Sequence, residues 1–228
     1  MAEATERDDT IMGGVRTLFE NADVLAVSKP EGLASIPERP RERASLLVTL
    51  EDRIGGKLYV VHRLDKGASG VIVFAKNPVS HRCINDQFAR REVSKTYLAL
   101  AHGILEEWRG TIDKPIRVYG SGRMGVDGKR GKKSETAYEV VRHVAGCTLV
   151  KAYPVTGRRH QVRVHFYSIG HPIVGDRRYG DVQIQKRFPR LMLHAQAIAF
   201  RLPTGESMTI EAPVPGSFQE VVDAVARG

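Results

Sequence analysis

Residues 60–77 read VVHRLDKGASGVIVFAKN and join a polar cluster to a turn and an apolar strand. The cluster is His62–Asp65, the turn is Lys66–Gly70, and the β-branched run Val71–Ala75 predicts a buried strand. A sharp turn that leads into a buried strand can present one carboxylate in a cleft. Asp65 is therefore a candidate catalytic residue, and the alternative is a structural aspartate that caps backbone amides in the turn.

Three further readings of Asp65 are a nucleophile, a general base and a metal ligand. No second carboxylate or histidine stands at ligand spacing around it, which disfavours a metal site. An ionised aspartate in a pocket needs a positive partner. Arg163 is a candidate for that partner, because arginine stays charged and offers bidentate donors. Tyr97 lies on a predicted strand, where a core position is the usual alternative.

The charge balance favours a polyanionic partner. The formal net charge is +9 and the sequence pI is about 9.7. Lys and Arg contacts to phosphates release counterions and steer association, so nucleic acid is one expected partner and a solvated basic surface is the alternative. The basic clusters are Arg39–Arg43, Lys129–Lys133, Arg158–Arg163, Arg177–Arg178 and Lys186–Arg190.

The composition is that of a soluble protein with a core. The chain has 228 residues, of which 42% are hydrophobic, and no stretch approaches the ~18 apolar residues of a membrane span. The polar start, residues 1–14, predicts a flexible segment and no signal peptide. We therefore expect a cytoplasmic monomer. Cys83 and Cys147 lack metal-ligand spacing and are expected to be reduced thiols.

Alternating and helical patterns predict many strands and a few helices. Helices are expected at Ser45–Ile54, from Asn77 to about Arg91, and through Ala226 after a capping box at Ser217–Glu220. Arg117–Lys133 predicts a mobile basic loop or hairpin tip, and His171–Gly180 a loop. The expected strands are two within Thr17–Lys29, then Val71–Ala75, Lys95–Leu100, Glu135–Val144, Cys147–Tyr153, Leu191–Leu202 and Met208–Glu211.

Thr156–Gly170 fits two structures. VRVHF alternates as a strand would, whereas the apolar spacing also makes a helical stripe. We favour a helix that Thr156 caps and Gly170 ends, in which Arg159 and Arg163 share one face. With no repeat and no linker, the pattern predicts one α+β domain.

Five segments, in this order along the chain, resemble a known family. They are Val27–Leu33, His62–Asp65 with Ser69-Gly70, Lys95–Ala99, Thr156–His165 with its continuation to Gly180, and Leu193–Ala195. Together they are similar to pseudouridine synthases of the RluA type. The resemblance implies the pseudouridine synthase fold over residues 15–228, with a mixed, mainly antiparallel sheet flanked by helices and loops.

The resemblance also implies a reaction, the isomerisation of uridine to pseudouridine in RNA. Asp65 matches the catalytic aspartate of the family, Tyr97 its active-site tyrosine and Arg163 the arginine that pairs with the aspartate. The aspartate acts either by direct attack on the sugar or by a glycal route. No external cofactor is expected, since nothing is oxidised and no group is transferred.

Substrate binding is implied for four further positions. Arg63 matches an arginine that displaces the target base and occupies its place, and His62, Arg158 and Leu193 lie in the matching segments. From the residues alone, His62 is expected to be structural, like His160, His165 and His194. A stacked uridine must flip out to reach a pocket carboxylate, so the expected partner is an RNA stem-loop.

Two residues depart from the family pattern. Ala68 stands where threonine is usual, and Arg159 stands where threonine or serine is common. The front of the chain is short for a separate RNA-binding domain, so a compact member is expected, with ribosomal RNA, transfer RNA or both as substrates. The alternatives are a non-catalytic RNA-binding protein or RNA chaperone on the same scaffold, and an unrelated hydrolase.

Overall fold

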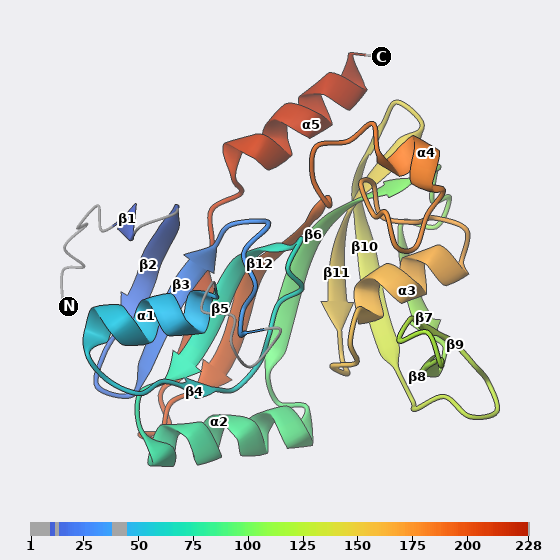
Figure 1. Cartoon of the computed structure of the whole chain (residues 1–228). Coiled ribbons are helices and arrows are strands. Elements are labelled where there is room, and N and C mark those ends of the chain that lie inside the picture. The colour runs from blue at the N-terminus through green and yellow to red at the C-terminus, as the bar shows by residue number, and fades with distance from the viewer. Residues whose placement is uncertain (1–9, 12–13, 38–44, 228) are drawn as a thin grey trace.

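The computed structural model describes residues 10–11, 14–37 and 45–227, and one sheet of eleven strands runs through it (Figure 1). Its strands are β1 Thr10–Ile11, β2 Val15–Glu20, β3 Val24–Lys29, β4 Tyr59–Val60, β5 Ser69–Ala75, β6 Ser94–His102, β7 Arg109–Asp113, β10 Glu135–Val144, β11 Cys147–Pro154, β12 Leu193–Arg201 and β13 Ser207–Glu211. A separate hairpin consists of β8 Ile116–Val118 and β9 Met124–Val126. The helices are α1 Leu46–Ile54, α2 Pro78–Arg90, α3 Gln161–Ser168, α4 Val182–Gln185 and α5 Gly216–Ala226.

The strand order β1-β2-β3-β5-β12-β6-β11-β10-β7 confirms the predicted α+β class and the mixed, mainly antiparallel sheet. Within the described residues, β5 and β12 form the parallel pair, and they lie at the middle of the sheet. Gly70 pairs with Ala195 there with φ +118°. A Cβ on Gly70 would lie 2.2 Å from the Ala195 carbonyl oxygen, so glycine is required for this close approach.

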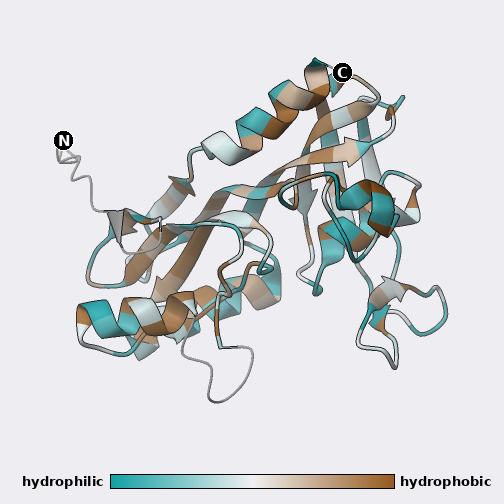
Figure 2. Cartoon of the chain, turned by 45° about the horizontal axis from the view of Figure 1, so that its top comes forward, coloured by the Kyte–Doolittle hydropathy of each residue, from teal (hydrophilic) through white to brown (hydrophobic). Residues whose placement is uncertain are grey.

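Two apolar cores flank the middle of the sheet. One packs β3 and β5 against α1, around Leu25, Leu50 and Phe74. The other packs β6, β10 and β11 against α3 and α5, around Leu100 and Phe166. Figure 2 shows the hydrophobic residues gathered along the strands of the sheet. Tyr97 on β6 packs partly against both cores, so it lies where they meet.

The predicted starts of α1 and α2 are confirmed. The Ser45 side chain accepts the Val48 N–H, and the Asn77 side chain accepts the Ser80 N–H before Pro78 in the first turn. The predicted strands also form, as β2, β3, β5, β6, β10, β11, β12 and β13. Arg117–Lys133, predicted as a loop or hairpin tip, overlaps the β8–β9 hairpin, which begins one residue earlier. The strands β1, β4 and β7 and the short helix α4 were not predicted.

The cap predicted for α3 is wrong. The helix begins at Gln161 after His160, and the Thr156 hydroxyl donates to the Gln161 side-chain oxygen instead of capping a helix there. Arg159 therefore lies before the helix and is exposed, so it does not share a helical face with Arg163. Gly170 follows the helix with φ +85°, as predicted for its end.

The predicted capping box of the last helix is also wrong. α5 begins at Gly216 with no side-chain cap, because the Ser217 hydroxyl donates to Glu31, far away in the sequence. Within the predicted flexible segment, residues 1–9 and 12–13 lie outside the described part, as does Arg39–Arg43. Among the described residues, no helix is long and apolar enough to cross a membrane.

Candidate active site

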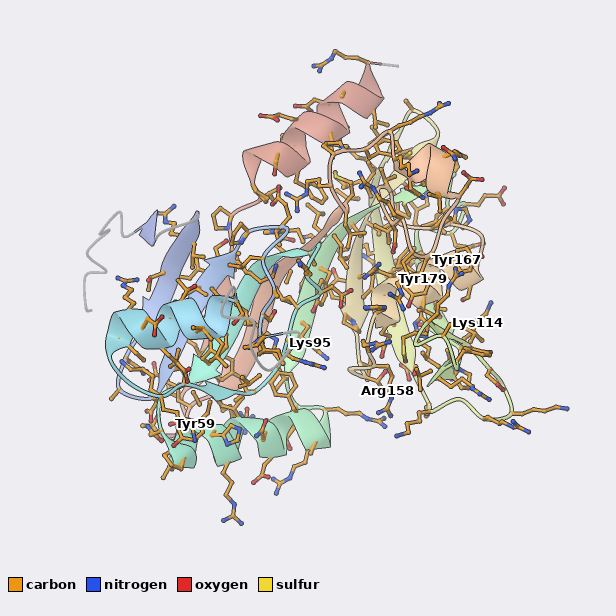
Figure 3. All side chains as sticks on the ribbon, in the orientation of Figure 1. Tyr59, Lys95, Lys114, Arg158, Tyr167 and Tyr179 are labelled. Atoms are coloured by element: carbon orange, nitrogen blue, oxygen red, sulfur yellow. The ribbon has the colours of Figure 1, made fainter. Side chains whose placement is uncertain are left out.

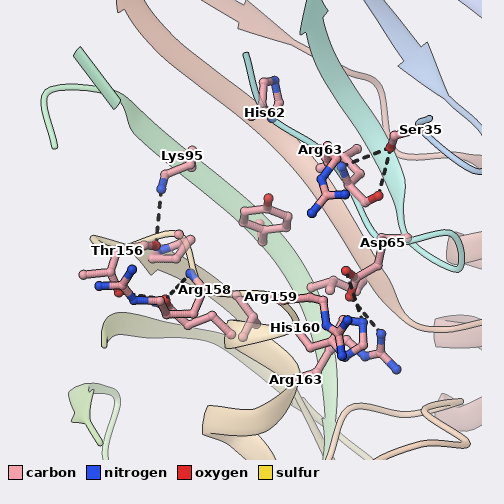
Figure 4. A pocket seen from close by; sticks show the side chains of 18 of the residues that line it. Ser35, His62, Arg63, Asp65, Lys95, Thr156, Arg158, Arg159, His160 and Arg163 are labelled. Atoms are coloured by element: carbon pink, nitrogen blue, oxygen red, sulfur yellow. Dashed lines mark hydrogen bonds and ion pairs between the residues drawn. The ribbon is translucent and has the colours of Figure 1, made fainter. Parts of the chain in front are cut away.

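A cavity of about 1190 Å³ opens between the two cores, beside the middle of the sheet. Segments from both sides of the molecule line it, including the turns before β5 and before α3 (Figure 4). The structure brings together in this cavity all of the site residues that the sequence suggested: His62, Arg63, Asp65, Tyr97, Arg158, Arg163 and Leu193.

The turn that carries Asp65 is fastened to the segment after β3. The buried Lys29 ammonium and the Gly32 N–H both donate to the Lys66 carbonyl, at 3.3 and 2.8 Å. The Ser35 hydroxyl donates to the Leu64 carbonyl and accepts the Leu64 N–H. These bonds hold the turn from both sides of Asp65, which explains why the two sequence segments belong to one site.

Lys29 is fully buried at the base of this turn. Its ammonium also donates to the carbonyls of Pro30 and Leu33, each at 2.8 Å. Burial lowers the pKa of Lys29 to about 7, although the negative charges of Asp65 and Glu31 oppose that shift.

Arg163 joins two carboxylates. Its Nη1 donates to Asp65 Oδ2 at 2.8 Å, while Nε and Nη2 donate to the two oxygens of Asp176 at 2.6 and 2.8 Å. Burial alone would lower the pKa of Arg163, but the bonds to Asp176 and the charge of Asp65 raise it above its ordinary value. Its ring neighbour is Tyr179, 5.1 Å from the guanidinium carbon to the ring centroid. Arg163 is therefore a charged, doubly fixed partner of Asp65.

His160 is a second neighbour of Asp65. Its Nε2 lies 3.7 Å from Asp65 Oδ1, and its Nδ1 lies 2.7 Å from the Tyr179 hydroxyl. Sequence reasoning treated His160 as structural and gave Asp176 and Tyr179 no role. Neither the contact between Asp176 and Arg163 nor the contact between His160 and Tyr179 has a signal in the sequence spacing, because the fold brings these residues together.

Tyr97 lies on β6 opposite Ala195 on one side and Ala152 on the other. Small neighbours leave its ring room at the cavity wall. Burial, together with the negative charge of Asp65, raises the pKa of the Tyr97 phenol above its ordinary value. The hydroxyl is therefore protonated near neutral pH and offers a ring face and an O–H group.

The remaining candidates differ in exposure. Arg63 is exposed at the cavity, and Leu193 is buried in its wall. The Arg158 guanidinium donates to the Lys133 carbonyl at 3.3 Å.

His62 accepts the Val73 N–H through Nε2, and burial with the nearby Lys95 charge lowers the pKa of His62 to about 3. The His62 ring is thus neutral and anchors the segment before Asp65 to β5.

Lys95 is another residue to which the sequence gave no role. It lies on β6, as Figure 3 shows, and its ammonium donates to the Thr156 carbonyl at 3.4 Å, with Arg158 beside Thr156 (Figure 4). Burial lowers the pKa of Lys95 to about 8. Among the described residues, no group of three or more His, Cys, Asp or Glu side chains could hold a metal ion.

Comparison with known proteins gives consistent matches. Residues 23–168 match the family model of RNA pseudouridylate synthase. The chain is 38% identical over 200 residues to the dual-specificity RNA pseudouridine synthase RluA of Escherichia coli K12, covering 86% of this chain and 91% of the relative. The RluA of Pasteurella multocida is 39% identical over 194 residues, with 83% and 88% covered.

Solved structures agree with this result. Human RNA pseudouridylate synthase domain containing 1 superposes with a TM-score of 0.77 and 31% identity, over 92% of this chain and 94% of the other. Human RNA pseudouridylate synthase domain containing 4 superposes with a TM-score of 0.75 and 25% identity, over 93% of each chain.

Proposed function

This chain belongs to the RNA pseudouridylate synthase family and isomerises uridine in RNA, and from that premise we propose that Asp65 is its catalytic carboxylate. The observation that carries the proposal is the pairing of Asp65 with Arg163 inside a cavity of about 1190 Å³. A fixed guanidinium beside a carboxylate balances its negative charge in a partly enclosed site. No other carboxylate among the described residues lines this cavity.

The reaction defines what such a carboxylate does. The bond between N1 of uracil and C1′ of ribose breaks, the base turns, and C5 bonds to C1′. C5 then loses its proton and N1 gains one, so the product has the same atoms as the substrate. Asp65 either attacks C1′ directly or takes a proton from C2′ on the glycal route. Arg163 orients Asp65 in both cases through the bond to Oδ2.

Tyr97 and Arg63 are proposed to handle the base. The Tyr97 ring lines the same cavity as Asp65 and offers a stacking surface for uracil, and its O–H group is proposed to assist where the C5 proton leaves. Arg63 is exposed beside Asp65 in sequence and is proposed to take the place of the displaced base in the RNA. His62, Arg158 and Leu193 are proposed to shape the pocket around the flipped nucleotide.

The substrate is proposed to be an unpaired uridine in an RNA stem-loop, in ribosomal RNA, transfer RNA or both. The net charge of +9 supports binding to RNA phosphates, and the named relatives are dual-specificity enzymes. The monomeric state and the cytoplasmic location stay predictions.

The test maps pseudouridine on cellular RNA from a strain that lacks this protein. The RNA is incubated with the wild-type protein or with Asp65→Ala, and new pseudouridines are located across ribosomal and transfer RNA. We expect new sites with the wild type and none with the variant. A wild type that makes no pseudouridine would favour the non-catalytic RNA-binding alternative, and an active Asp65→Ala variant would remove Asp65 from the reaction.

A further inference from the structure

The two oxygens of Asp65 have different neighbours. Arg163 donates to Oδ2, while the Nε2 atom of His160 lies 3.7 Å from Oδ1 (Figure 4). That distance is longer than a hydrogen bond, but catalytic hydrogen bonds are often long before the substrate binds and tighten in the complex. One donor at Oδ2 leaves the carboxylate free to turn about its Cβ–Cγ bond, whereas a second donor at Oδ1 would fix its plane.

The contacts of Tyr179 bear on which ring nitrogen of His160 carries the hydrogen. The buried Tyr179 hydroxyl accepts the Met124 N–H at 3.2 Å and lies 2.7 Å from His160 Nδ1. A phenolic hydroxyl has one hydrogen to donate. The Met124 contact uses the oxygen as an acceptor, and among the described residues Nδ1 of His160 is the acceptor that the hydroxyl hydrogen can reach. The ring hydrogen of neutral His160 is then on Nε2, the atom that faces Asp65.

The neutral form of His160 is the relevant one. Burial lowers the pKa of His160 to about 4, and the charges of Arg163, Arg159 and Arg178 act in the same direction, although Asp65 opposes them. A neutral imidazole has one N–H group, so its tautomer decides whether Asp65 meets a donor or a lone pair. The backbone of His160 is left-handed, with φ +57°, which is uncommon outside glycine and often marks functional sites.

We propose that Tyr179 fixes the tautomer of His160, and that His160 thereby directs its Nε2–H group to Oδ1 of Asp65 and orients the carboxylate for reaction. His160 is then a positioning residue, and the inference rests on the proposed catalytic role of Asp65. Since the hydroxyl of Tyr179 also receives the N–H of Met124 on β9, the hairpin supports the same chain of contacts.

Asparagine and glutamine at position 160 separate this role from a purely structural one. In His160→Asn, the short amide replaces Nδ1, keeps the bond to Tyr179 and tolerates the left-handed backbone, but it does not reach Asp65. In His160→Gln, the longer amide places an N–H near the position of Nε2 but loses the bond to Tyr179. If His160 were only a structural anchor, His160→Asn would be the more active of the two variants. If His160 positions Asp65, His160→Gln is the more active one.

The experiment measures single-turnover release of tritium from cellular RNA labelled at C5 of uridine, because C5 loses its hydrogen in the reaction. We expect His160→Asn and Tyr179→Phe to lower the rate constant by about tenfold, with unchanged RNA affinity, and His160→Gln to retain more of the rate. Adding Tyr179→Phe to His160→Asn should lower the rate no further, since both changes remove the same donor.

Thermal unfolding checks that each variant is folded. Should His160→Asn fail to fold, Tyr179→Phe decides the question, because it keeps the aromatic ring beside Arg163. A wild-type rate in the folded His160→Asn variant, or in Tyr179→Phe, would overturn the inference and leave the proposed function intact. A wild-type protein that releases no tritium from any cellular RNA would instead overturn the proposed function.

Discussion

Arg163 binds a second carboxylate in addition to Asp65. Its guanidinium uses three nitrogens on two carboxylates, and one of these, Asp176, is 1% exposed. Asp176 also accepts the backbone N–H groups of Arg178 and Tyr179. The arginine that orients Asp65 therefore also holds the loop after α3 in place, through its separate ion pair with Asp176.

Arg163→Leu should destabilise the protein as well as inactivate it. Removing one partner of a buried ion pair leaves an uncompensated charge on Asp176, which costs roughly 3–5 kcal/mol. The double variant Arg163→Leu with Asp176→Asn should recover most of that loss, because the amide oxygen still accepts the two backbone N–H groups. Urea unfolding of the single and double variants measures this. Equal stability of Arg163→Leu and wild type would contradict the account.

At the scale of elements, the parallel pair β5–β12 sets the position of the catalytic turn. β5 begins at Ser69, four residues after Asp65, and Gly70 lies against the backbone of Ala195. The Ser69 hydroxyl is also bonded to His194 on β12 and to Arg190. A shift of β5 against β12 would move the turn that holds Asp65.

Gly70→Ala should lower the stability by about 3 kcal/mol or more, because the new Cβ would lie 2.2 Å from the Ala195 carbonyl oxygen. Gly205→Ala is the matched control. Its φ is also positive, at +85°, but no atom lies within 4 Å of the added Cβ, so we expect a cost of about 1–2 kcal/mol from backbone strain alone. Equal losses for both variants in thermal unfolding would mean that the close contact in the sheet is not rigid.

Local signals predicted the elements better than their ends. Ser45 and Asn77 cap the helices that follow them, because those bonds involve neighbours in sequence. Ser217 and Thr156 carry the same capping signals but bond to Glu31 and Gln161. Glu31 is far from Ser217 in the sequence and is not visible in a local pattern, whereas Gln161 is a neighbour that competes for the Thr156 hydroxyl.

In the candidate site too, the sequence identified the main residues but not the partners that the fold brings to them. The segments that resemble the family supplied Asp65, Tyr97 and Arg163, and the structure places them around one cavity. Their supporting partners were missed, since Asp176 and His160 acquire meaning through contacts made by the fold. The αL backbone of His160 also depends on tertiary contacts and has no sequence signature.

At the scale of the whole molecule, buried neutral histidines predict sensitivity to acid. The pKa values of His62, His160, His165 and His194 all lie below the ordinary 6.5, chiefly because of burial. Below about pH 6.5 the unfolded chain binds these protons and the folded protein does not. Stability therefore falls as the pH drops from 6.5 toward the folded-state values, about 3 for His62 and about 4 for His160.

The variant His62→Gln tests the predicted loss of stability at low pH for one histidine. The glutamine oxygen can accept the Val73 N–H but does not titrate. Between about pH 7.5 and about pH 5, wild type should lose roughly 2 kcal/mol more stability than the variant, at about 1.4 kcal/mol per pH unit below 6.5. Urea unfolding at both pH values gives the comparison, and a pH dependence that the substitution leaves unaltered would contradict a neutral His62 in the folded protein.

The central claim is that Asp65 performs the chemistry. The direct measurement is single-turnover release of tritium from cellular RNA labelled at C5 of uridine, with wild type, Asp65→Asn and the control Asp52→Asn, which makes the same change at an exposed position on α1. We predict a loss of roughly a thousandfold or more for Asp65→Asn, with unchanged RNA affinity and folding, and a wild-type rate for the control. Tritium release by Asp65→Asn at a rate near that of wild type would contradict the account.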